Sequence, residues 1–571
     1  MTPPKARQLH LILCWHMHQP DYRDYASGEF EMPWTYLHAI KDYADMAAHV
    51  EAEPRARAVF NFVPVLLDQL EDYVAQFDSG KFRDPLLRAL AAPDLNVLNN
   101  EDRKHLVDAC FRCDHEQMIE PYVPYKRLFE LFKRVDALGE SALCYLSGQY
   151  LADLVGWYHL VWVGETVRRG DPLPVRLMAK GVGFDYQDRQ ALLALLGDTV
   201  RGIIPRYRKL LADGRIEISC TPHFHPIAPL LIDFQAAREA APDSSLPHCN
   251  HYPGGSVRVR YHINLALESH TRRFGAAPAG MWPAEGGVSQ PLLGLFKDAG
   301  LSWTATGTAV LANSLHQGGQ KPDRLADYLY RPYQIKEQKN GPVIFFRDDG
   351  LSDMIGFEYS KWNGQDAANH FVQQLENIYS AVPEGQEPVV SVILDGENAW
   401  EYYPYNGYFF LSALYKTLAD HPYIRMTTFR DYLREHAAVA KPEPLSRLAA
   451  GSWVYGNFST WIGDRSKNAA WDLLCEAKRA HDLVLATGGI SKERLQDIER
   501  QLCDCESSDW FWWFGDYNPQ HSVESFDRLY RENLMRLYRL LGITPPASLD
   551  VPICHGSTAA VEAGGAMRRA S

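Results

Sequence analysis

The sequence lacks the features of membrane and nucleic-acid-binding proteins. The apolar run from Leu9 to Trp15 is far shorter than the roughly 20 residues that cross a bilayer, and His16 follows it at once. The 58 lysines and arginines are outnumbered by 71 aspartates and glutamates, which gives a net charge of −13. This balance argues against nucleic acid and anionic membranes as partners. We expect no signal peptide, no membrane span and a cytoplasmic location.

Cysteines are few and are not arranged for metal binding. Ten are scattered over 571 residues, and neither Cys110/Cys113 nor Cys503/Cys505 belongs to a doubled CxxC set. Zinc-binding domains and disulfide frameworks use regular cysteine spacings. Reduced thiols in the cytoplasm are therefore the favoured interpretation.

Apolar and aromatic residues, in contrast, are abundant. A chain of 571 residues that is 46% hydrophobic can bury a large core and exceeds one compact unit. Aromatic residues make up 12%, and many of them stand beside carboxylates, glycine and proline. Aromatic rings fit the flat apolar faces of sugars, but large proteins also bury such rings in their cores. Composition alone leaves both explanations open.

Short β-branched or apolar runs alternate with long amphipathic stretches. This alternation predicts an α/β fold with a parallel sheet wrapped by helices, most simply a barrel. The predicted strands are 9–14, 58–63, 216–220, 303–306, 343–346 and 389–394, and the clearest predicted helices between them are 190–211, 290–299 and 367–382.

Four of the predicted strands end in polar segments. These segments hold His16/His18, residues 221–225, Arg347/Asp348 and Asp395/Glu397. Reactive residues of parallel barrels gather beyond the carboxyl ends of the strands. The pattern therefore predicts one shared active site.

The pattern of residues along the chain changes after residue 436. We predict a catalytic domain with helical insertions over 1–436, a linker at 437–444 and a helical domain over 445–545 that completes the substrate cleft. Within it, helical periodicity is clear at 469–486, 491–503 and 523–541. The small and polar end, residues 546–571, is expected to be disordered.

Two histidine-bearing motifs stand near the first and third strands. His16 and His18 alternate along an extended segment, so they point to the same side. The segment 214–226 places Glu217 inside a strand, where a buried carboxylate needs a partner, and an orienting role beside His16 or His18 is plausible. Together with His223 and His225, the motifs are compatible with a sugar-binding cluster, with loop packing or with a transition-metal site.

Two carboxylates follow later strands. Glu285 lies between a proline and two glycines, on a constrained backbone that other groups can approach closely. Asp395 follows a strand that is apolar except for Ser391, and it precedes Gly396. A helix-cap role for Glu285 and a turn role for Asp395 are the plain structural alternatives.

Five segments together resemble glycoside hydrolase family 57, in the order in which that family has them. They are HMHQP at 16–20, GRIEISCTPHFHP at 214–226, GMWPAEGGVSQ at 280–290, VILDGENAWEYYPYNG at 392–407 and WVYGNFSTWIGDRSKNAAW at 453–471. Residues 345–362 and 507–516 are most similar to the amylopullulanase and α-amylase branch. Arg215 departs from the family pattern, where glutamine is usual, and this leaves the subtype of activity less secure than the family.

The resemblance implies an incomplete (β/α)7 barrel followed by a helical domain. It implies that Glu285 is the nucleophile and Asp395 the acid/base of a retaining enzyme with no cofactor and no catalytic metal. The substrate would be an α-glucan or maltooligosaccharide of the starch or glycogen type, cleaved by double displacement at α-1,4 bonds, with α-1,6 bonds as an additional target that the resemblance allows. Carried over residue by residue, the substrate-binding set is His16, His18, Glu217, His223, Trp282, Trp400, Trp461 and Asp464.

Other activities remain open at this point. A 4-α-glucanotransferase or a branching enzyme would use the same catalytic pair. A metal-dependent enzyme of the mannosidase or deacetylase type and a non-catalytic glucan-binding protein are further alternatives, although the intact pair Glu285 and Asp395 argues against the latter. Oligomeric state and chain-length preference are not set by these residues.

Overall fold

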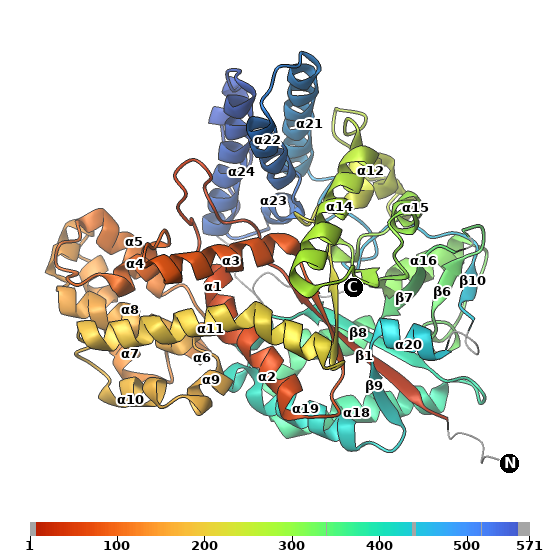
Figure 1. The fold of residues 1–571 in the computed structure, drawn as a ribbon, viewed down its shortest axis with the longest axis horizontal. Coiled ribbons are helices and arrows are strands. Elements are labelled where there is room, and N and C mark those ends of the chain that lie inside the picture. Colours follow the sequence, from red (N-terminus) through yellow and green to blue (C-terminus); the bar gives the residue numbers. More distant parts are fainter. Residues whose placement is uncertain (1–6, 339, 437–440, 516, 558–571) are drawn as a thin grey trace.

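Seven parallel strands form a closed ring at the centre of the molecule. The computed structural model describes residues 7–338, 340–436, 441–515 and 517–557. The ring runs β8-β1-β2-β3-β4-β5-β7 and closes because β7 also pairs with β8, with Arg347 opposite Ser391. Its strands are β1 (Leu9–Met17), β2 (Ala58–Phe62), β3 (Ile216–Cys220), β4 (Gly280–Met281), β5 (Trp303–Gly307), β7 (Val343–Arg347) and β8 (Val389–Asp395). The predicted incomplete (β/α)7 barrel is confirmed (Figure 1).

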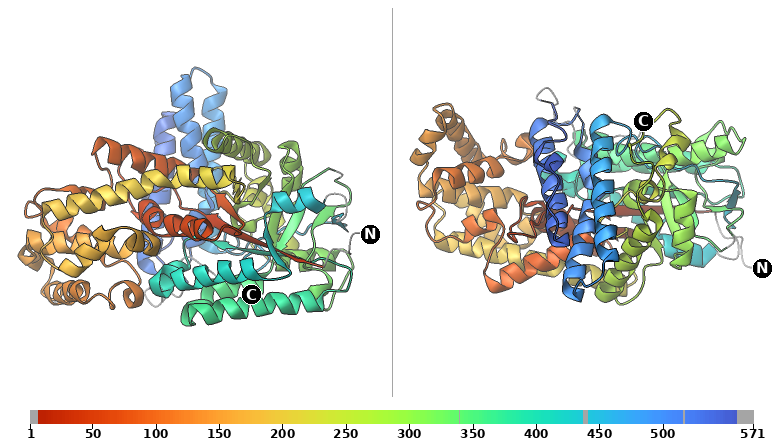
Figure 2. Two further views of the ribbon diagram at one scale, coloured as in Figure 1. Left: turned by 60° about the horizontal axis from the view of Figure 1, so that its bottom comes forward. Right: turned by 90° about the horizontal axis from the view of Figure 1, so that it is seen from above.

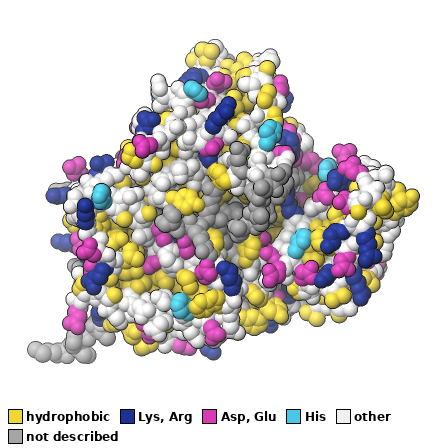
Figure 3. Space-filling model, turned by 180° about the vertical axis from the view of Figure 1, so that it is seen from behind, with side chains coloured by type: hydrophobic (Ala, Val, Ile, Leu, Met, Phe, Trp, Pro, Cys, Tyr) yellow, Lys and Arg dark blue, Asp and Glu magenta, His cyan; other side chains and the backbone are white. Residues whose placement is uncertain are grey.

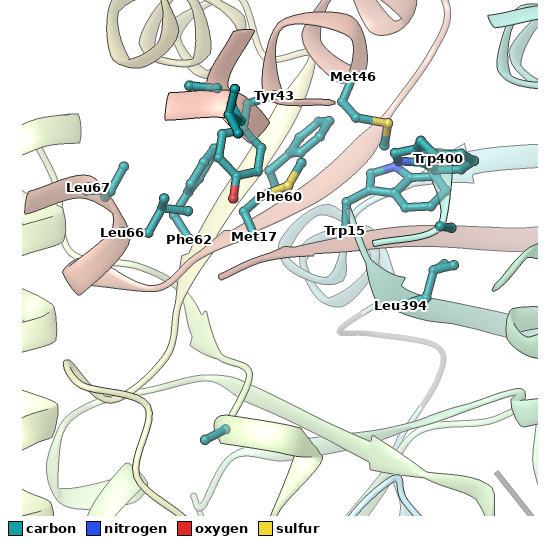
Figure 4. Close-up of a cluster of buried hydrophobic side chains, with 14 of the residues drawn as sticks. Trp15, Met17, Tyr43, Met46, Phe60, Phe62, Leu66, Leu67, Leu394 and Trp400 are labelled. Atoms are coloured by element: carbon teal, nitrogen blue, oxygen red, sulfur yellow. The ribbon is translucent and has the colours of Figure 1, made fainter. Parts of the chain in front are cut away.

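Strand β1 shows why its sequence is apolar on both faces. Trp15 packs outward with helix residues, beside Met46 and Trp400 (Figure 4). Ile12 and Cys14 face the other way, into an interior cluster with side chains of four other barrel strands. Alternation along the strand therefore directs the even-numbered residues inward, and it places His16 at the carboxyl end of the barrel interior.

The predicted strands all exist, but β4 was not predicted. It contains only two residues, too few to give a periodic signal, because Pro283 follows almost at once. A side chain at Gly280 would collide with the ring of Trp303 on β5, since a Cβ there would lie 2.2 Å from it. Glycine is required for these two strands to pair this closely.

Three short strands extend the sheet beyond the barrel. β9 (Ile424–Thr427) pairs with β1, β6 (Tyr333–Ile335) lies antiparallel to β7, and β10 (Glu443–Leu445) pairs with β6. Helix α20 (Phe429–His436) closes the amino end of the barrel, where Phe429 and Tyr432 join the interior cluster. Of the predicted linker at 437–444, residues 437–440 lie outside the described residues, while Glu443 and Pro444 belong to β10.

A large helical insertion separates β2 from β3 and forms the lobe in orange and yellow in Figure 1. It contains α3 (Pro64–Ser79), α4 (Pro85–Ala91), α5 (Asn100–Cys110), α6 (His115–Met118), α7 (Val123–Asp136), α8 (Gly148–Trp162), α9 (Glu165–Gly170), α10 (Pro172–Lys180) and α11 (Tyr186–Ala212). Before it come α1 (Trp34–His38) and α2 (Ala44–Ala52). The insertion contributes one wall of the cavity described below.

The remaining connections cover the barrel with further helices. They include α12 (Ala228–Ile232), α13 (Ala237–Ala240), α14 (Gly255–Phe274), α15 (Gln290–Asp298), α16 (Thr308–Gln317), α17 (Asp349–Asp353), α18 (Gly364–Ala381) and α19 (Tyr408–Asp420). The three helices predicted between the strands are present as α11, α15 and α18, each within a few residues of the expected bounds.

The carboxyl-terminal part of the chain is helical, as the periodicity indicated. It contains α21 (Arg465–Ala486), α22 (Lys492–Cys505), α23 (Ser508–Trp513) and α24 (Gln520–Leu541). In Figures 1 and 2 these helices lie between the insertion and α14. Residues 546–557, part of the expected disordered tail, are described: Ala547–Asp550 forms a 3-10 helix, and Leu549 and Cys554 are buried. The rest of that tail lies outside the described residues.

The face of the molecule in Figure 3 carries charges of both signs. On the face in Figure 3, cationic and anionic side chains are interspersed rather than separated. No helix of the described part is both long and apolar enough to cross a bilayer. The described residues also contain no disulfide.

Candidate active site

A cavity of about 760 Å³ lies at the carboxyl ends of the barrel strands. The barrel, the helical insertion and α23 all contribute to its walls. Lining residues include His16, His18, Glu285, Arg347, Asp395 and Glu397 from the barrel, Phe111 and His115 from the insertion, and Ser508, Asp509, Trp512 and Trp513 from α23. Both predicted catalytic carboxylates and both histidines of the first motif therefore meet in one cleft.

Strand register brings His16 to the floor of this cleft. On β1 it lies opposite Asn61 of β2 and Asp395 of β8. His16 Nδ1 is 2.7 Å from the amide oxygen of Asn61. Because an amide oxygen only accepts, His16 carries its proton on Nδ1 and leaves Nε2 as an acceptor. Burial lowers the pKa of His16 to about 3, so the ring is neutral.

His225 is the member of the second motif that reaches the cluster. Its Nε2 donates to His16 Nε2 across 3.2 Å, and its Nδ1 accepts from the hydroxyl of Ser508 at 2.9 Å. Its ring stacks on His18 with the centroids 3.8 Å apart. The backbone of His225 is left-handed, with φ of 58°, a strained conformation that surrounding contacts must maintain.

His223, two residues earlier, does not reach the cavity. Its Nε2 pairs with Asp68 at 3.2 Å, and Asp68 also binds Arg273. The motif was correctly chosen as part of the site, but its contribution to the cluster comes from His225. The left-handed turn that reverses the direction of the two side chains is not visible in the residue pattern.

His18 connects the barrel to the carboxyl-terminal helices. Its Nε2 donates to Asp509 of α23 at 2.9 Å, and its backbone N–H donates to Glu397 at 2.9 Å. Sequence reasoning missed Asp509, although it lies in the aromatic segment 507–516. One ligand atom each from His18, His225 and Asp509 lies within 4.8 Å of the others, so these three could hold a metal ion. In this structure the same atoms are engaged in hydrogen bonds.

Glu285 follows β4 on a strained backbone. Its φ is 56°, and Gly286 after it is also left-handed. The indole N–H of Trp453 donates to Glu285 Oε2 at 2.9 Å, and the backbone N–H of Trp453 donates to the Glu285 carbonyl. Arg347 lies over the Trp453 ring, 4.9 Å from its centroid. Hydrogen bonding to a carboxylate favours its ionised form, so this arrangement suits a nucleophile.

Asp395 has the opposite electrostatic environment. Burial raises the pKa of its carboxyl group, while the hydrogen bond from Asn398 and the attraction of His18 and Arg347 lower it in part. Beside it, burial and the charge of Asp395 hold the pKa of Glu397 well above its ordinary value. A carboxyl group that keeps its proton towards neutral pH can serve as a general acid.

Glu217 lies one layer below this cluster. It pairs in register with Val59, which pairs with Cys14, whereas Asn61 and His16 form the next layer towards the cleft. Both of its oxygens accept hydrogen bonds at 2.8 Å, one from the Trp303 indole and one from the Arg430 backbone. The expectation of an inward carboxylate with a partner is met. The expectation that it orients His16 or His18 is not, because the strand places it one layer too deep.

The other predicted binding residues surround the cavity without lining it. Trp282 is buried and meets Trp453 edge-on at 5.1 Å, and Trp400 donates to the Gly396 carbonyl at 2.8 Å. Trp461 is buried behind Trp512, and Asp464 caps α21. The aromatic walls of the cavity come instead from Trp453, Tyr455, Trp512 and Trp513.

Substitution of Asp509 tests whether the contact between α23 and His18 contributes to activity. Asp509→Asn removes the charged acceptor that holds His18, and we expect turnover to fall about 10- to 100-fold, because small displacements of positioning groups cost this much. Initial rates on soluble starch measure the effect. Asp497→Asn, an exposed carboxylate on α22, serves as the matched control. Equal rates for both variants would show that His18 does not depend on Asp509.

Comparison with known families decides the class of this site. A model of the family described as glycosyl hydrolase family 57 matches residues 12–442. The chain belongs to this family. The match covers the barrel except for the first three residues of β1, the insertion and both candidate catalytic carboxylates, so the protein is a glycoside hydrolase-type enzyme. No curated protein matched the chain in sequence.

Solved structures of family 57 enzymes share the fold over nearly the whole chain. A branching enzyme from Pyrococcus horikoshii superposes with a TM-score of 0.56 and 16% identity, covering 95% of this chain and 93% of its own. A branching enzyme from Thermococcus kodakaraensis gives 0.55 and 16%, covering 98% of each chain. An α-amylase from Thermotoga maritima gives 0.54 and 14%, covering 94% and 93%. The likeness therefore includes the carboxyl-terminal helices that follow residue 442.

Proposed function

We propose that this family 57 enzyme is a retaining α-glucan-active glycoside hydrolase with Glu285 as nucleophile and Asp395 as acid/base. The observation that carries the proposal is that two carboxyl groups in different environments line one cavity. Glu285 accepts a hydrogen bond that favours its ionised form. Burial raises the pKa of Asp395, which favours its protonated form. Opposite protonation states of two carboxyl groups are what double displacement requires.

In the first step, Glu285 attacks the anomeric carbon as the bond to the leaving oxygen breaks. Asp395 gives its proton to that oxygen, so the released chain leaves as an alcohol and the glycosyl-enzyme ester remains. In the second step, the ionised Asp395 takes a proton from water, whose oxygen attacks the anomeric carbon and releases Glu285. His16 and His18, fixed by Asn61 and Asp509, line the cavity in which the sugar would bind.

The substrate class we propose is a starch- or glycogen-type α-glucan or a maltooligosaccharide. Two structural relatives named above are branching enzymes and one is an α-amylase, and all three names describe enzymes of such glucans. The aromatic rings of Trp453, Tyr455, Trp512 and Trp513 supply flat apolar surfaces for sugar rings. We further propose α-1,4 bonds as the main target, with α-1,6 bonds as a possible second.

Transglycosylation is the second candidate for the same site. A sugar hydroxyl can replace water in the second step if it stacks beside the glycosyl-enzyme, as in a 4-α-glucanotransferase or a branching enzyme. The aromatic wall formed by α23 on the cleft favours such an acceptor. We expect transfer products from maltooligosaccharides at high substrate concentration and hydrolysis when the substrate is dilute.

Product analysis tests the proposal directly. We expect the first-formed reducing end to have the α configuration, because two inversions at the anomeric carbon restore its original configuration. Proton NMR during the first turnovers, followed by sizing of products from amylose, pullulan and maltotriose, measures configuration and specificity. Parallel reactions after dialysis against a chelator should run at the same rate. An initial β-anomer would exclude Glu285 as nucleophile, and activity lost to chelator and restored by zinc would favour a metal-dependent enzyme of the mannosidase type.

A further inference from the structure

A second cluster of ligating side chains lies at the amino end of the barrel, where α20 packs against its base. It contains His10 of β1, Glu387 from the segment before β8 and His436, the last residue of α20. One ligand nitrogen from each histidine and one oxygen of Glu387 all lie within 4.8 Å of one another. Three segments far apart in sequence meet here.

The separations in this cluster are compatible with a bound metal ion. His10 Nε2 lies 3.3 Å from Glu387 Oε2, and His436 Nε2 lies 3.7 Å from the same oxygen. The second distance is too long for a hydrogen bond. Ligands around a tetrahedral zinc ion, bonded at about 2.0–2.1 Å, stand about 3.3 Å apart. The two nitrogen–oxygen distances are close to this value, and all three donor atoms lie within 4.8 Å of one another.

Hydrogen bonds with neighbouring groups orient the donor atoms towards one another. His436 Nδ1 donates to the Tyr432 carbonyl at 2.9 Å, which leaves Nε2 as a lone-pair donor towards Glu387. The backbone N–H of Gln8 donates to Glu387 Oε1, which leaves Oε2 for the histidines. Orienting hydrogen bonds of this kind support metal-binding histidines and carboxylates.

Packing and charge in the surroundings support the same conclusion. The Tyr432 ring stacks on His436 at 4.4 Å and meets His10 edge-on at 5.3 Å. Arg425, whose charge acts on His10, is engaged by Glu435 at 3.1 Å. The side chain of Glu387 is 33% exposed, so water can supply a fourth ligand.

We propose that His10, Glu387 and His436 form a binding site for a divalent transition-metal ion, of which zinc is the best representative. Two imidazoles and one carboxylate suit zinc and its first-row neighbours rather than calcium or magnesium. The site joins the start of β1, the segment before β8 and the end of α20. A bound ion would therefore hold these three elements together at the amino end of the barrel. It lies at the opposite end of the strands from the cleft and takes no part in the proposed catalysis.

Another buried group in the described part, His262 with Cys503 and Glu506, does not compete for this role. Arg258 already donates to Glu506 and to the Cys503 sulfur, and its charge occupies the place of a cation. The cluster of His18, His225 and Asp509 lies in the cleft, where these residues are engaged in hydrogen bonds. The experiment below separates the two clusters by mutation.

Zinc binding to the chelator-treated full-length protein tests the proposal. We expect isothermal titration with zinc chloride to give one equivalent of binding that Glu387→Gln and His436→Gln each abolish, together with the zinc-induced rise in Tm. Cobalt should give a visible absorption spectrum that the same variants lack. Circular dichroism shows whether the variants are folded, and Glu387, being partly exposed, offers the milder change.

The matched control is His421→Gln, which removes a histidine paired with a single carboxylate, Glu376, at 3.3 Å. This variant should bind zinc like the wild-type protein. The proposal is overturned if the wild-type protein binds no zinc, or if both cluster variants keep the same zinc stoichiometry and the same rise in Tm. The latter result would assign the metal to another cluster and would leave the proposed glycosidase mechanism untouched.

Discussion

Glu285→Gln is expected to lower turnover of α-glucans by roughly 10³-fold or more, because the amide cannot form the glycosyl-enzyme. Glutamine has the same shape and can still accept the hydrogen bond from Trp453 through its amide oxygen. Folding and glucan binding should therefore change little, since the lost interaction belongs to the transition state. Initial rates, thermal melting and equilibrium binding of a maltooligosaccharide measure the three quantities.

A control and a rescue experiment define the role of Glu285 more closely. Glu376→Gln alters a carboxylate far from the cleft and should retain wild-type turnover. With the truncated variant Glu285→Ala and an activated α-glucoside, azide can attack the anomeric carbon in place of the nucleophile and should give a β-glycosyl azide. Near-normal turnover by Glu285→Gln, or an α-glycosyl azide from Glu285→Ala, would assign the nucleophile to another residue.

Asp395→Asn is expected to reduce turnover about 10²- to 10⁴-fold, the usual contribution of general acid–base catalysis. The same variant should change the pH profile. Because burial raises the pKa of Asp395, the wild-type acid stays protonated to higher pH than an ordinary aspartic acid, and the rate falls as pH rises through that pKa. Asparagine does not titrate, so this alkaline limb should disappear from kcat/KM.

Leaving-group dependence distinguishes an acid catalyst from a structural residue. Substrates with a good leaving group need little protonation, so the defect of Asp395→Asn should be much smaller on an activated aryl glucoside than on maltotriose. Asp171→Asn, which keeps the cap of α10, controls for the loss of one carboxylate. An equal defect on both substrates with an unchanged alkaline limb would show that Asp395 is not the proton donor.

The strand pattern predicted the barrel because burial on both faces leaves apolar runs that stand out from the helices. It missed β4 because two residues between Ala279 and Trp282 carry no period. The pattern also predicted that polar segments after several strands would meet, and they line one cavity, since parallel strands present their carboxyl ends on one side. It could not give the depth of each residue in the barrel. Glu217 was predicted to bind the substrate, but strand register places it one layer below the cleft.

By itself, the sequence determined the class of fold and the family, and it singled out Glu285 after β4 and Asp395 at the end of β8 as candidates. These features depend on local patterns, which a strand and the turn after it carry within a few residues. The tertiary structure alone decided which side chains assist them. His225 reaches the cluster through a left-handed turn, Asp509 reaches His18 across 491 residues of chain, and Trp453 supports Glu285 from a distant segment. Such contacts depend on how separate elements pack, and no local pattern records that.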